Sequence, residues 1–347
     1  MSKTFISLLR TWIALSLLTG CSLSSAPWPG FALWPATATI PPTLVPTATA
    51  TPTSTPSPTP QSSATPTATP TEIPRPRRVL ILSIDGLRPD AIALAPMPNL
   101  LELMQTGAYS LNAQTTFPSA TLPAHTSMLS GQCPDKHGLY WNDYIPDYGY
   151  ANGPTIFSLV KDAGLRTIMF VGKEKLRQIT PPENTDVYRY INDRDLVIIA
   201  EIIPELQKGF DLVFIHFPTA DWMGHEYGWL SPEQFSVLRR ADEALGNLLT
   251  ALEESGLREE TLFIITADHG GHDQTHGSSR PEDMTIPWIA NGPGIVPVEL
   301  RIPIATMDTS ATTAWALKFP LPEEWDGIPV LEAFGEPTQN RPESRCP

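Results

Sequence analysis

Four short apolar runs, each followed closely by charged or imidazole side chains, are the feature that most limits how this chain can fold. The runs are residues 79–84, 166–172, 210–217 and 261–265. A continuous apolar run of this length is typical of a strand buried on both faces, as in a parallel sheet covered by helices. Helical patterns separate the runs, at residues 98–107, 153–164, 198–208 and 231–256. The alternation predicts an α/β fold, a three-layer sandwich with a largely parallel sheet and helices on both faces.

The residues that follow these runs carry the chemistry of the chain. In chain order they are Asp85, then Lys173, Lys175 and Arg177, then Asp221 and His225, and finally Asp268 and His269. Open α/β sheets bind ligands outside the carboxyl ends of their strands, where all these residues are expected. Two simpler interpretations stay open. Asp85 can serve as a helix N-cap, and the three cations can form a solvated loop instead of a phosphate clamp.

The seven histidines fall into three short clusters, which indicates a shared site. They are His125, His137, His216, His225, His269, His272 and His276. Zinc accepts carboxylate oxygen and imidazole nitrogen as ligands. Asp221 and His225 are four residues apart, so on a helical turn they face the same way and can share one cation. With Asp85, the clusters predict a site for two metal ions. The alternative for the last cluster is an ordinary polar loop.

Thr121 stands at the start of a helical pattern, two residues before Pro123. A hydroxyl at a helix start lies at the positive end of the helix dipole, beside free backbone N–H groups. This position suits a nucleophile and an anionic substrate. The alternative is that Thr121 only caps the helix.

The first 21 residues are typical of an export signal, with Lys3 and Arg10 before an apolar core too short to span a bilayer. The signal ends in Leu-Thr-Gly-Cys, which resembles the lipobox of bacterial lipoproteins. That resemblance implies lipidation of Cys21 and a membrane-anchored lipoprotein that faces the extracellular or periplasmic side. An ordinary signal peptide is the alternative, and export is expected either way.

Residues 22–76 are expected to form a disordered linker, because residues 35–74 are almost wholly Thr, Pro, Ala and Ser. About 40 residues at roughly 3.1 Å each reach up to about 120 Å from an anchor. Thr-Pro repeats of this kind are also plausible O-glycosylation stalks. The folded domain is expected at residues 77–336, and residues 337–347 are expected to be a loose tail.

The net charge of −14 argues against binding to a nucleic-acid duplex, which needs a basic face. A phosphorylated substrate is compatible with this charge, because bound metal ions supply local positive charge. Among the cysteines, Cys133 and Cys346 can pair in an oxidising compartment or remain a buried thiol and a tail thiol.

From about residue 77 to residue 335 the chain resembles the alkaline phosphatase superfamily, and most closely its type I phosphodiesterase/nucleotide pyrophosphatase branch. The family's motifs occur here in the right order, separated along the chain. They are a strand-end aspartate at Asp85, a T-x-P-x-H segment from Thr121 to His125, a His-Gly at His137, a D-x-x-x-H pair at Asp221 and His225, and an Asp-His-Gly at Asp268.

The resemblance implies two divalent metal ions, most simply Zn²⁺. One would be held by Asp85, Thr121, Asp268 and His269, the other by Asp221, His225 and a late histidine. We expect this late ligand to be His276, which precedes a glycine, in preference to His272. Asn142 matches the family's substrate-binding asparagine. Residues Lys173 and Lys175 resemble a K-x-K segment of phosphonoacetate hydrolase and are expected to bind substrate.

The resemblance also implies a metal-dependent hydrolase of phosphate esters that acts through a covalent phosphothreonine at Thr121. The substrate would be a nucleotide or another small phosphate ester. A phosphomonoesterase or a phosphonate hydrolase is the alternative activity. A sulfatase is disfavoured, because Thr121 and His125 replace the Cys or Ser and the Arg of the sulfatase segment. A rival of another class is a surface lipoprotein that keeps the fold for binding without catalysis.

Overall fold

The computed structural model describes residues 75–342 and 345–346. The expected signal segment with Cys21, and nearly all of the expected linker, lie outside these residues. Within the described part of the chain, no helix is both long enough and apolar enough to cross a bilayer.

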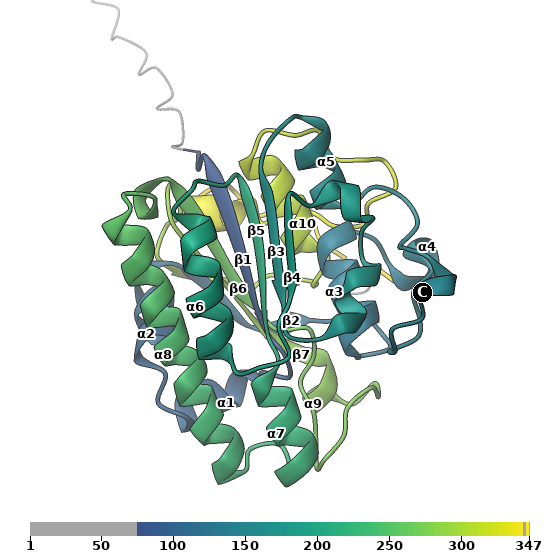
Figure 1. Cartoon of the computed structure of the whole chain (residues 1–347), viewed down its shortest axis with the longest axis vertical. Helices are drawn as coiled ribbons and strands as arrows, with labels where there is room; N and C mark the ends of the chain where they lie inside the picture. Colours follow the sequence, from purple (N-terminus) through teal and green to yellow (C-terminus); the bar gives the residue numbers. More distant parts are fainter. Residues whose placement is uncertain (1–74, 343–344, 347) are drawn as a thin grey trace, which may run out of the picture. The chain divides into compact units, whose positions relative to one another are not determined.

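A single eight-stranded sheet forms the centre of the domain, in the order β4-β3-β5-β1-β6-β7-β2-β8 (Figure 1). The pairings make β7 antiparallel to both its neighbours, while every other pairing is parallel. The strands are β1 (Arg78–Ile84), β2 (Ala108–Gln114), β3 (Thr167–Val171), β4 (Val187–Tyr190), β5 (Leu212–Phe217), β6 (Thr261–Thr266), β7 (Thr285–Asn291) and β8 (Val298–Glu299).

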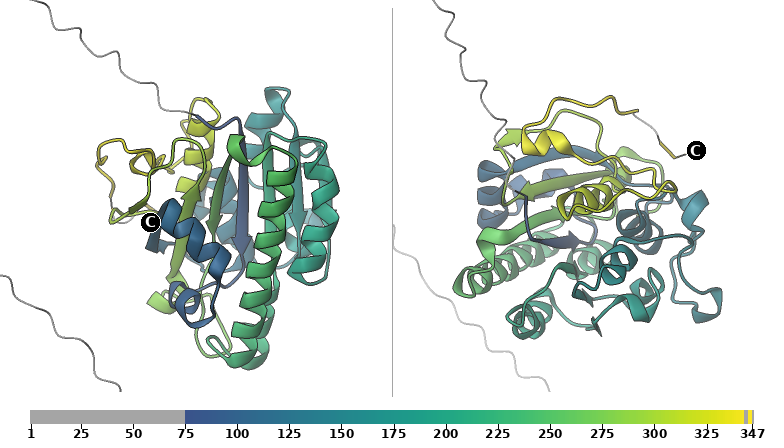
Figure 2. Two further views of the ribbon diagram at one scale, coloured as in Figure 1. Left: turned by 90° about the vertical axis from the view of Figure 1, so that its left-hand side faces the viewer. Right: turned by 90° about the horizontal axis from the view of Figure 1, so that it is seen from above.

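Helices pack against both faces of the sheet (Figure 2). Helices α2, α6, α7 and α8 pack together in one layer, and α3, α4, α5 and α10 pack together in the other. The helices are α1 (Pro89–Leu94), α2 (Pro98–Thr106), α3 (Thr121–Ser130), α4 (Pro134–His137), α5 (Ile156–Asp162), α6 (Asp195–Leu206), α7 (Thr219–Tyr227), α8 (Pro232–Glu254), α9 (Pro281–Met284) and α10 (Asp308–Ala316). Short 3₁₀ turns are η1 (Pro146–Tyr148), η2 (Glu174–Gln178), η3 (Pro182–Asn184), η4 (Arg258–Glu260) and η5 (Leu331–Phe334). The predicted three-layer α/β fold with a largely parallel sheet is confirmed.

The apolar runs of the sequence form the middle of the sheet. Strands β5 and β6 are buried at every position, and β1 at every position after Arg78. Full burial of one Leu, Ile, Val or Phe side chain contributes about 1.5–3 kcal/mol, so these strands supply much of the driving force for folding. Because β3, β5, β1 and β6 are adjacent and parallel, the residues that follow them meet at one edge of the sheet.

The C-terminal segment is held against the domain where the structure describes it. Cys346 forms a disulfide with Cys133, just before α4. Two arginines of the segment, Arg341 and Arg345, form buried ion pairs with Asp308 at the start of α10. The sequence suggests a loose tail after residue 336 because the segment is polar. Its anchors are acidic residues that come earlier in the chain, so local composition does not reveal them.

Candidate metal centre

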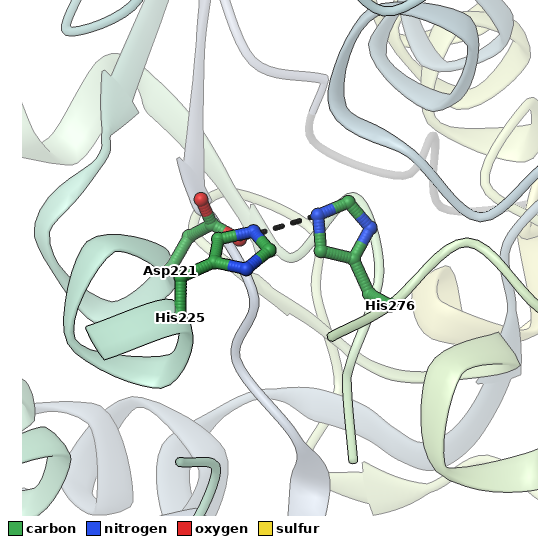
Figure 3. Close-up of side chains that lie close together, drawn as sticks. All are labelled: Asp221, His225 and His276. Carbon is green, nitrogen blue, oxygen red and sulfur yellow. Dashed lines mark ion pairs between the residues drawn. The ribbon is translucent and has the colours of Figure 1, made fainter. Parts of the chain in front are cut away.

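Helix α7 and the loop after β6 bring an aspartate and two histidines together at the carboxyl edge of the sheet. Asp221 Oδ1 lies 3.5 Å from His225 Nε2 and 3.6 Å from His276 Nε2. Figure 3 shows the three side chains close together, with a dashed line marking the ion pair that reaches His276. Asp221 and His225 share one face of α7 as their four-residue spacing predicts, because residues four apart are neighbours on a helix.

A second, fully buried cluster lies where β1 and β6 end. His269 Nε2 is 3.5 Å from Asp85 Oδ1 and 3.3 Å from Asp268 Oδ2. Ligand atoms of Asp85, Asp221 and His269 also lie within 4.8 Å of one another, so the two clusters adjoin. These separations are longer than good N–H···O hydrogen bonds and leave room for a cation between the atoms.

The atoms that face one another in these clusters lack other partners. Asp85 Oδ1, Asp221 Oδ1, Asp268 Oδ2 and His269 Nε2 are buried and have no hydrogen-bond partner among the described residues. A buried polar atom without a partner costs about 1–3 kcal/mol, more when it is charged. Divalent cations would satisfy all four atoms at once, so the residues present fit the metal ions that the sequence implies.

The histidines of the clusters are oriented to offer an electron pair. Nδ1 of His225, His269 and His276 lies 2.7–3.0 Å from the backbone carbonyls of Gln274, Gly270 and Ser119, in that order. A carbonyl oxygen only accepts, so Nδ1 carries the proton and Nε2 is left with its lone pair facing the carboxylates. Burial lowers the pKa of His276 to about 3, which keeps its ring neutral at physiological pH.

The structure separates the two candidates for the late histidine. His276 lies beside Asp221 and His225, whereas His272 Nδ1 is bound to Asp283 Oδ1 at 2.6 Å. Spacing alone could not decide between them, because both follow the same Asp-His-Gly segment and the loop conformation determines which ring turns inward.

Thr121 is the first residue of α3 and is fully buried. The N-cap of the helix is Ala120, and the Thr121 side chain makes no capping bond. Its hydroxyl instead accepts a hydrogen bond from Lys173 Nζ at 3.1 Å. His125, one turn further along α3, donates from Nδ1 to the Thr121 carbonyl at 2.7 Å and so fixes the start of the helix. The structure therefore does not support a capping role for the hydroxyl.

Lys173, immediately after Gly172 at the end of β3, reaches into the centre between the clusters. Its ammonium lies 2.7 Å from Asp85 Oδ2 and 2.6 Å from Asp221 Oδ2. Burial alone would lower the pKa of Lys173, but the carboxylates of Asp221, Asp85 and Asp268 raise it above its usual value. The side chain is therefore a fixed cation.

His216, on β5, contacts this centre, and the sequence indicates no individual role for it beyond its place among the clustered histidines. Its Nδ1 accepts the Gly172 N–H at 3.1 Å, so its Nε2 carries the proton and donates to Asp85 Oδ2 at 2.8 Å. Burial by itself raises the pKa of Asp85, but Lys173 and His216 lower it well below the usual range. For Asp268, burial and the neighbouring Asp85 raise the pKa well above the usual range, although Lys173 acts in the opposite direction. The parallel register that pairs His216 with Ser83 is what brings it to Asp85, and only the folded sheet reveals this neighbour.

The backbone of Gly86 completes the second cluster, which contains Asp85, Asp268 and His269. Its N–H donates to Asp268 Oδ1 at 3.1 Å, which leaves Oδ2 to face His269. Gly86 adopts a left-handed φ of +75°, and an added Cβ would lie 3.2 Å from the Asp221 backbone. The Asp85-Gly86 pair therefore needs glycine both for its conformation and for the close approach of α7. Asp85 does not cap a helix, because the N-cap of α1 is Arg88.

A cleft of about 350 Å³ opens beside the centre and contains Lys173 and Lys175. Its other walls include Asp143, Tyr144, Tyr190 and Trp222. Among the described residues, Lys175 has no hydrogen-bond or ion-pair partner, whereas Arg177 turns away toward the rings of Tyr144 and Tyr188. The three cations of this segment therefore differ: one is bound in the centre, one faces the cleft and one packs on aromatic rings.

Asn142 lies against the start of α3. Its Oδ1 accepts the Leu122 N–H at 3.0 Å. The Asn142 amide therefore lies next to the backbone of the residue after Thr121. This contact uses its oxygen, so its NH₂ group can donate a hydrogen bond to another atom.

Comparison with known proteins shows which family the chain is similar to. A family model described as Type I phosphodiesterase / nucleotide pyrophosphatase matches residues 79–284. The chain is 23% identical over 215 residues to an uncharacterized pyrophosphatase/phosphodiesterase of Schizosaccharomyces pombe, covering 55% of this chain and 44% of that protein. It is 26% identical over 219 residues to ectonucleotide pyrophosphatase/phosphodiesterase family member 1 of Homo sapiens, covering 55% of this chain and 23% of that protein. The matched region is less than half the length of these relatives.

A solved structure has the same fold. It is murine ectonucleotide pyrophosphatase/phosphodiesterase 5, in an inactive threonine-to-alanine variant bound to AMP. The TM-score is 0.61 at 17% sequence identity, and the superposition covers 74% of this chain and 98% of that chain.

Proposed function

Because the chain belongs to the type I phosphodiesterase/nucleotide pyrophosphatase family, we propose that it hydrolyses phosphate esters at a two-metal site with Thr121 as nucleophile. One observation carries the proposal. Buried oxygens of Asp85, Asp221 and Asp268 and the Nε2 of His269 have no hydrogen-bond partner among the described residues. The Lys173 ammonium joins Asp85 and Asp221 to the Thr121 hydroxyl. Buried polar atoms without partners lower the stability of the protein. A two-metal hydrolase requires them as metal ligands, whereas a protein that only binds a ligand on its surface does not.

The proposed ligands divide between two divalent ions. Asp85, Thr121, Asp268 and His269 would hold the first, and Asp221, His225 and His276 the second. When bound, the ions would supply Lewis acidity and positive charge for phosphoryl transfer. Zinc suits this mixture of carboxylate and imidazole ligands.

The proposed reaction has two steps. Thr121 Oγ1 attacks phosphorus while the bond to the leaving oxygen breaks, which gives a phosphothreonine and a free alcohol or phosphate. Water then attacks the phosphothreonine, releases the phosphoryl product and restores the hydroxyl. His125 holds the Thr121 backbone, so the nucleophile keeps its position through both steps.

Two groups are placed to bind the substrate. Asn142 uses its Oδ1 for the Leu122 N–H, which leaves its NH₂ group to donate to a phosphoryl oxygen. Lys175 faces the cleft without a carboxylate partner among the described residues, so its ammonium is available to an anionic substrate group.

The family description favours a diester or pyrophosphate bond. The second candidate, a monoester or phosphonate, is favoured by the cations at Lys173 and Lys175, because extra positive charge stabilises a dianion more than a monoanion. Turnover of bis-p-nitrophenyl phosphate and of p-nitrophenyl phosphate by one preparation would rank the two.

The decisive test compares Thr121→Ala with Thr121→Ser in the full chain. We expect the alanine variant to lose about 10³-fold or more in kcat while it binds zinc at the wild-type stoichiometry, and the serine variant to keep part of the activity. Acid quenching with a ³²P-labelled substrate should trap label on the wild-type protein only. Substantial turnover by a metal-loaded alanine variant would exclude Thr121 as nucleophile. Absence of turnover by the wild-type protein on any ester would favour the non-catalytic binding lipoprotein.

We also propose that the protein is exported and anchored through a lipid on Cys21, with the Thr/Pro-rich linker as a stalk. The Cys133–Cys346 disulfide supports export, because disulfides persist in oxidising compartments. Palmitate labelling of wild-type protein and of Cys21→Ser would test the anchor, and the variant should be recovered unlabelled.

A further inference from the structure

Lys173 occupies a position that binding of substrate alone does not explain. Its ammonium contacts three groups of the centre, which are Asp85 Oδ2 at 2.7 Å, Asp221 Oδ2 at 2.6 Å and the Thr121 hydroxyl at 3.1 Å. Asp85 belongs to one proposed metal ion and Asp221 to the other. The side chain is only 10% exposed, so little of it is left for a substrate.

The two oxygens of each carboxylate make different contacts. Oδ2 of Asp85 and Oδ2 of Asp221 are taken by the ammonium, whereas Oδ1 of each is buried without a hydrogen-bond partner among the described residues. The Oδ1 atoms are the ones that face the histidines, at His269 for Asp85 and at His225 and His276 for Asp221.

We propose that Lys173 is a permanent third cation of the metal centre, which shares the carboxylates of Asp85 and Asp221 with the two divalent ions. Three aspartates are buried here, and Lys173 is the cationic side chain within ion-pair distance of two of them. The ammonium compensates their mutual repulsion. It also weakens the affinity of the centre for metal, because it withdraws charge from two ligands and repels the incoming ions.

Lys175 provides a matched control, since it carries the same charge two residues further on and faces the cleft instead of the carboxylates. The inference rests on the metal centre proposed above. The experiment therefore measures the melting temperature of the full chain in EDTA and in excess zinc, and the zinc affinity by competition with a chelator.

We expect Lys173→Met to lower the melting temperature in EDTA by roughly 10 °C, because a buried pair that loses one partner leaves an uncompensated charge. We expect its zinc affinity to rise by about tenfold or more. Lys173→Arg should resemble the wild type in both measurements. Lys175→Met should leave the EDTA melting temperature unchanged, whatever its effect on substrate binding.

A second neutral variant, Lys173→Gln, keeps hydrogen-bond donors without the charge. The inference requires it to behave like Lys173→Met, and wild-type behaviour would overturn the role of charge. An unchanged or lower zinc affinity in Lys173→Met would also overturn the inference. If zinc does not raise the melting temperature even of the wild-type protein, the proposed metal centre itself fails, and the inference fails with it.

Discussion

Two buried clusters of charge in this domain differ in how their carboxylates are satisfied. At the carboxyl edge of the sheet, Asp85, Asp221 and Asp268 each keep one buried oxygen without a hydrogen-bond partner among the described residues. Beside α10, both oxygens of Asp308 are bound, by the backbone N–H groups of Ile328 and Ala305 and by two arginines.

In the second cluster the carboxylate oxygens of Asp308 and Glu332 all have partners. Glu332 accepts the Gln339 N–H at one oxygen and Arg341 at the other. Guanidinium groups match carboxylates in charge and geometry, so this cluster ties the C-terminal segment to α10 without any added ion. Burial of carboxylates is thus not by itself a sign of function. What distinguishes the first cluster is that its unsatisfied atoms converge, and only an external cation would complete it.

The largest expected effect follows from Asp268→Asn. We expect kcat/KM to fall by about 10³-fold or more, because an amide replaces an anionic ligand. The melting temperature in EDTA should stay the same or rise, since burial and Asp85 raise the pKa of Asp268 and so disfavour its charged form, which the neutral amide does not have. Ester hydrolysis and thermal unfolding in EDTA measure the two effects. A marked loss of metal-free stability would contradict the contrast between the clusters.

The reverse pattern is expected for Asp308→Asn. Loss of the carboxylate leaves Arg341 and Arg345 buried without their shared anion, so the free energy of unfolding should fall by about 3–5 kcal/mol. Zinc stoichiometry should remain that of the wild type. Urea unfolding and metal analysis give both values. A loss of bound zinc without a loss of stability would show that the two clusters are not separate.

Cys346→Ser tests how much the covalent link adds to the arginine contacts. The disulfide joins residues 213 positions apart. Removal of such a link typically costs about 2–4 kcal/mol, and we expect the lower part of this range because the ion pairs of Arg341 remain. Urea unfolding with and without a reductant measures the effect. The wild-type protein in reductant should match the variant.

His137 lies in neither cluster, and its effect on stability is confined to acidic pH. It is buried, bonded to Ser127 and the Leu139 N–H, and burial lowers its pKa to about 4. The unfolded chain therefore binds more protons than the folded chain between about pH 6.5 and pH 4. Stability contributed by this residue should be lost as the pH falls through that window, by about 1.4 kcal/mol per pH unit. Urea unfolding of His137→Gln should show a correspondingly weaker pH dependence.

The resemblance to the type I phosphodiesterase branch and the fold class could both be predicted from the sequence, and both are confirmed. Periodicity explains the success with the fold, because apolar runs and helical patterns are local. The positions of Asp85 and Asp268 could be predicted for the same reason, since a residue that follows a buried parallel strand lies at the carboxyl edge of the sheet. The helical spacing of Asp221 and His225 is equally local.

The remaining features depend on neighbours from other parts of the chain. The contact of His216 with Asp85 arises from strand register. The position of the Lys173 ammonium depends on Asp85, which follows β1, and on Asp221, which lies in α7. Spacing could not decide between His276 and His272, because the fold of one loop separates them. In the same way, the sequence around Arg341 and Arg345 is typical of a loose tail, because it does not show that both arginines contact Asp308 in the folded domain.

The direction of β1 has a consequence for how the protein would work on a surface. The chain enters the described domain at Arg75 and passes along β1 from Arg78 to Ile84, directly before Asp85 (Figure 1). Any tether upstream of residue 75 therefore joins the sheet at its amino edge, whereas the reactive groups lie about 23 Å further along, at roughly 3.3 Å per residue. A tether joined at that edge would leave the carboxyl edge, where the proposed metal centre lies, unobstructed by its own attachment.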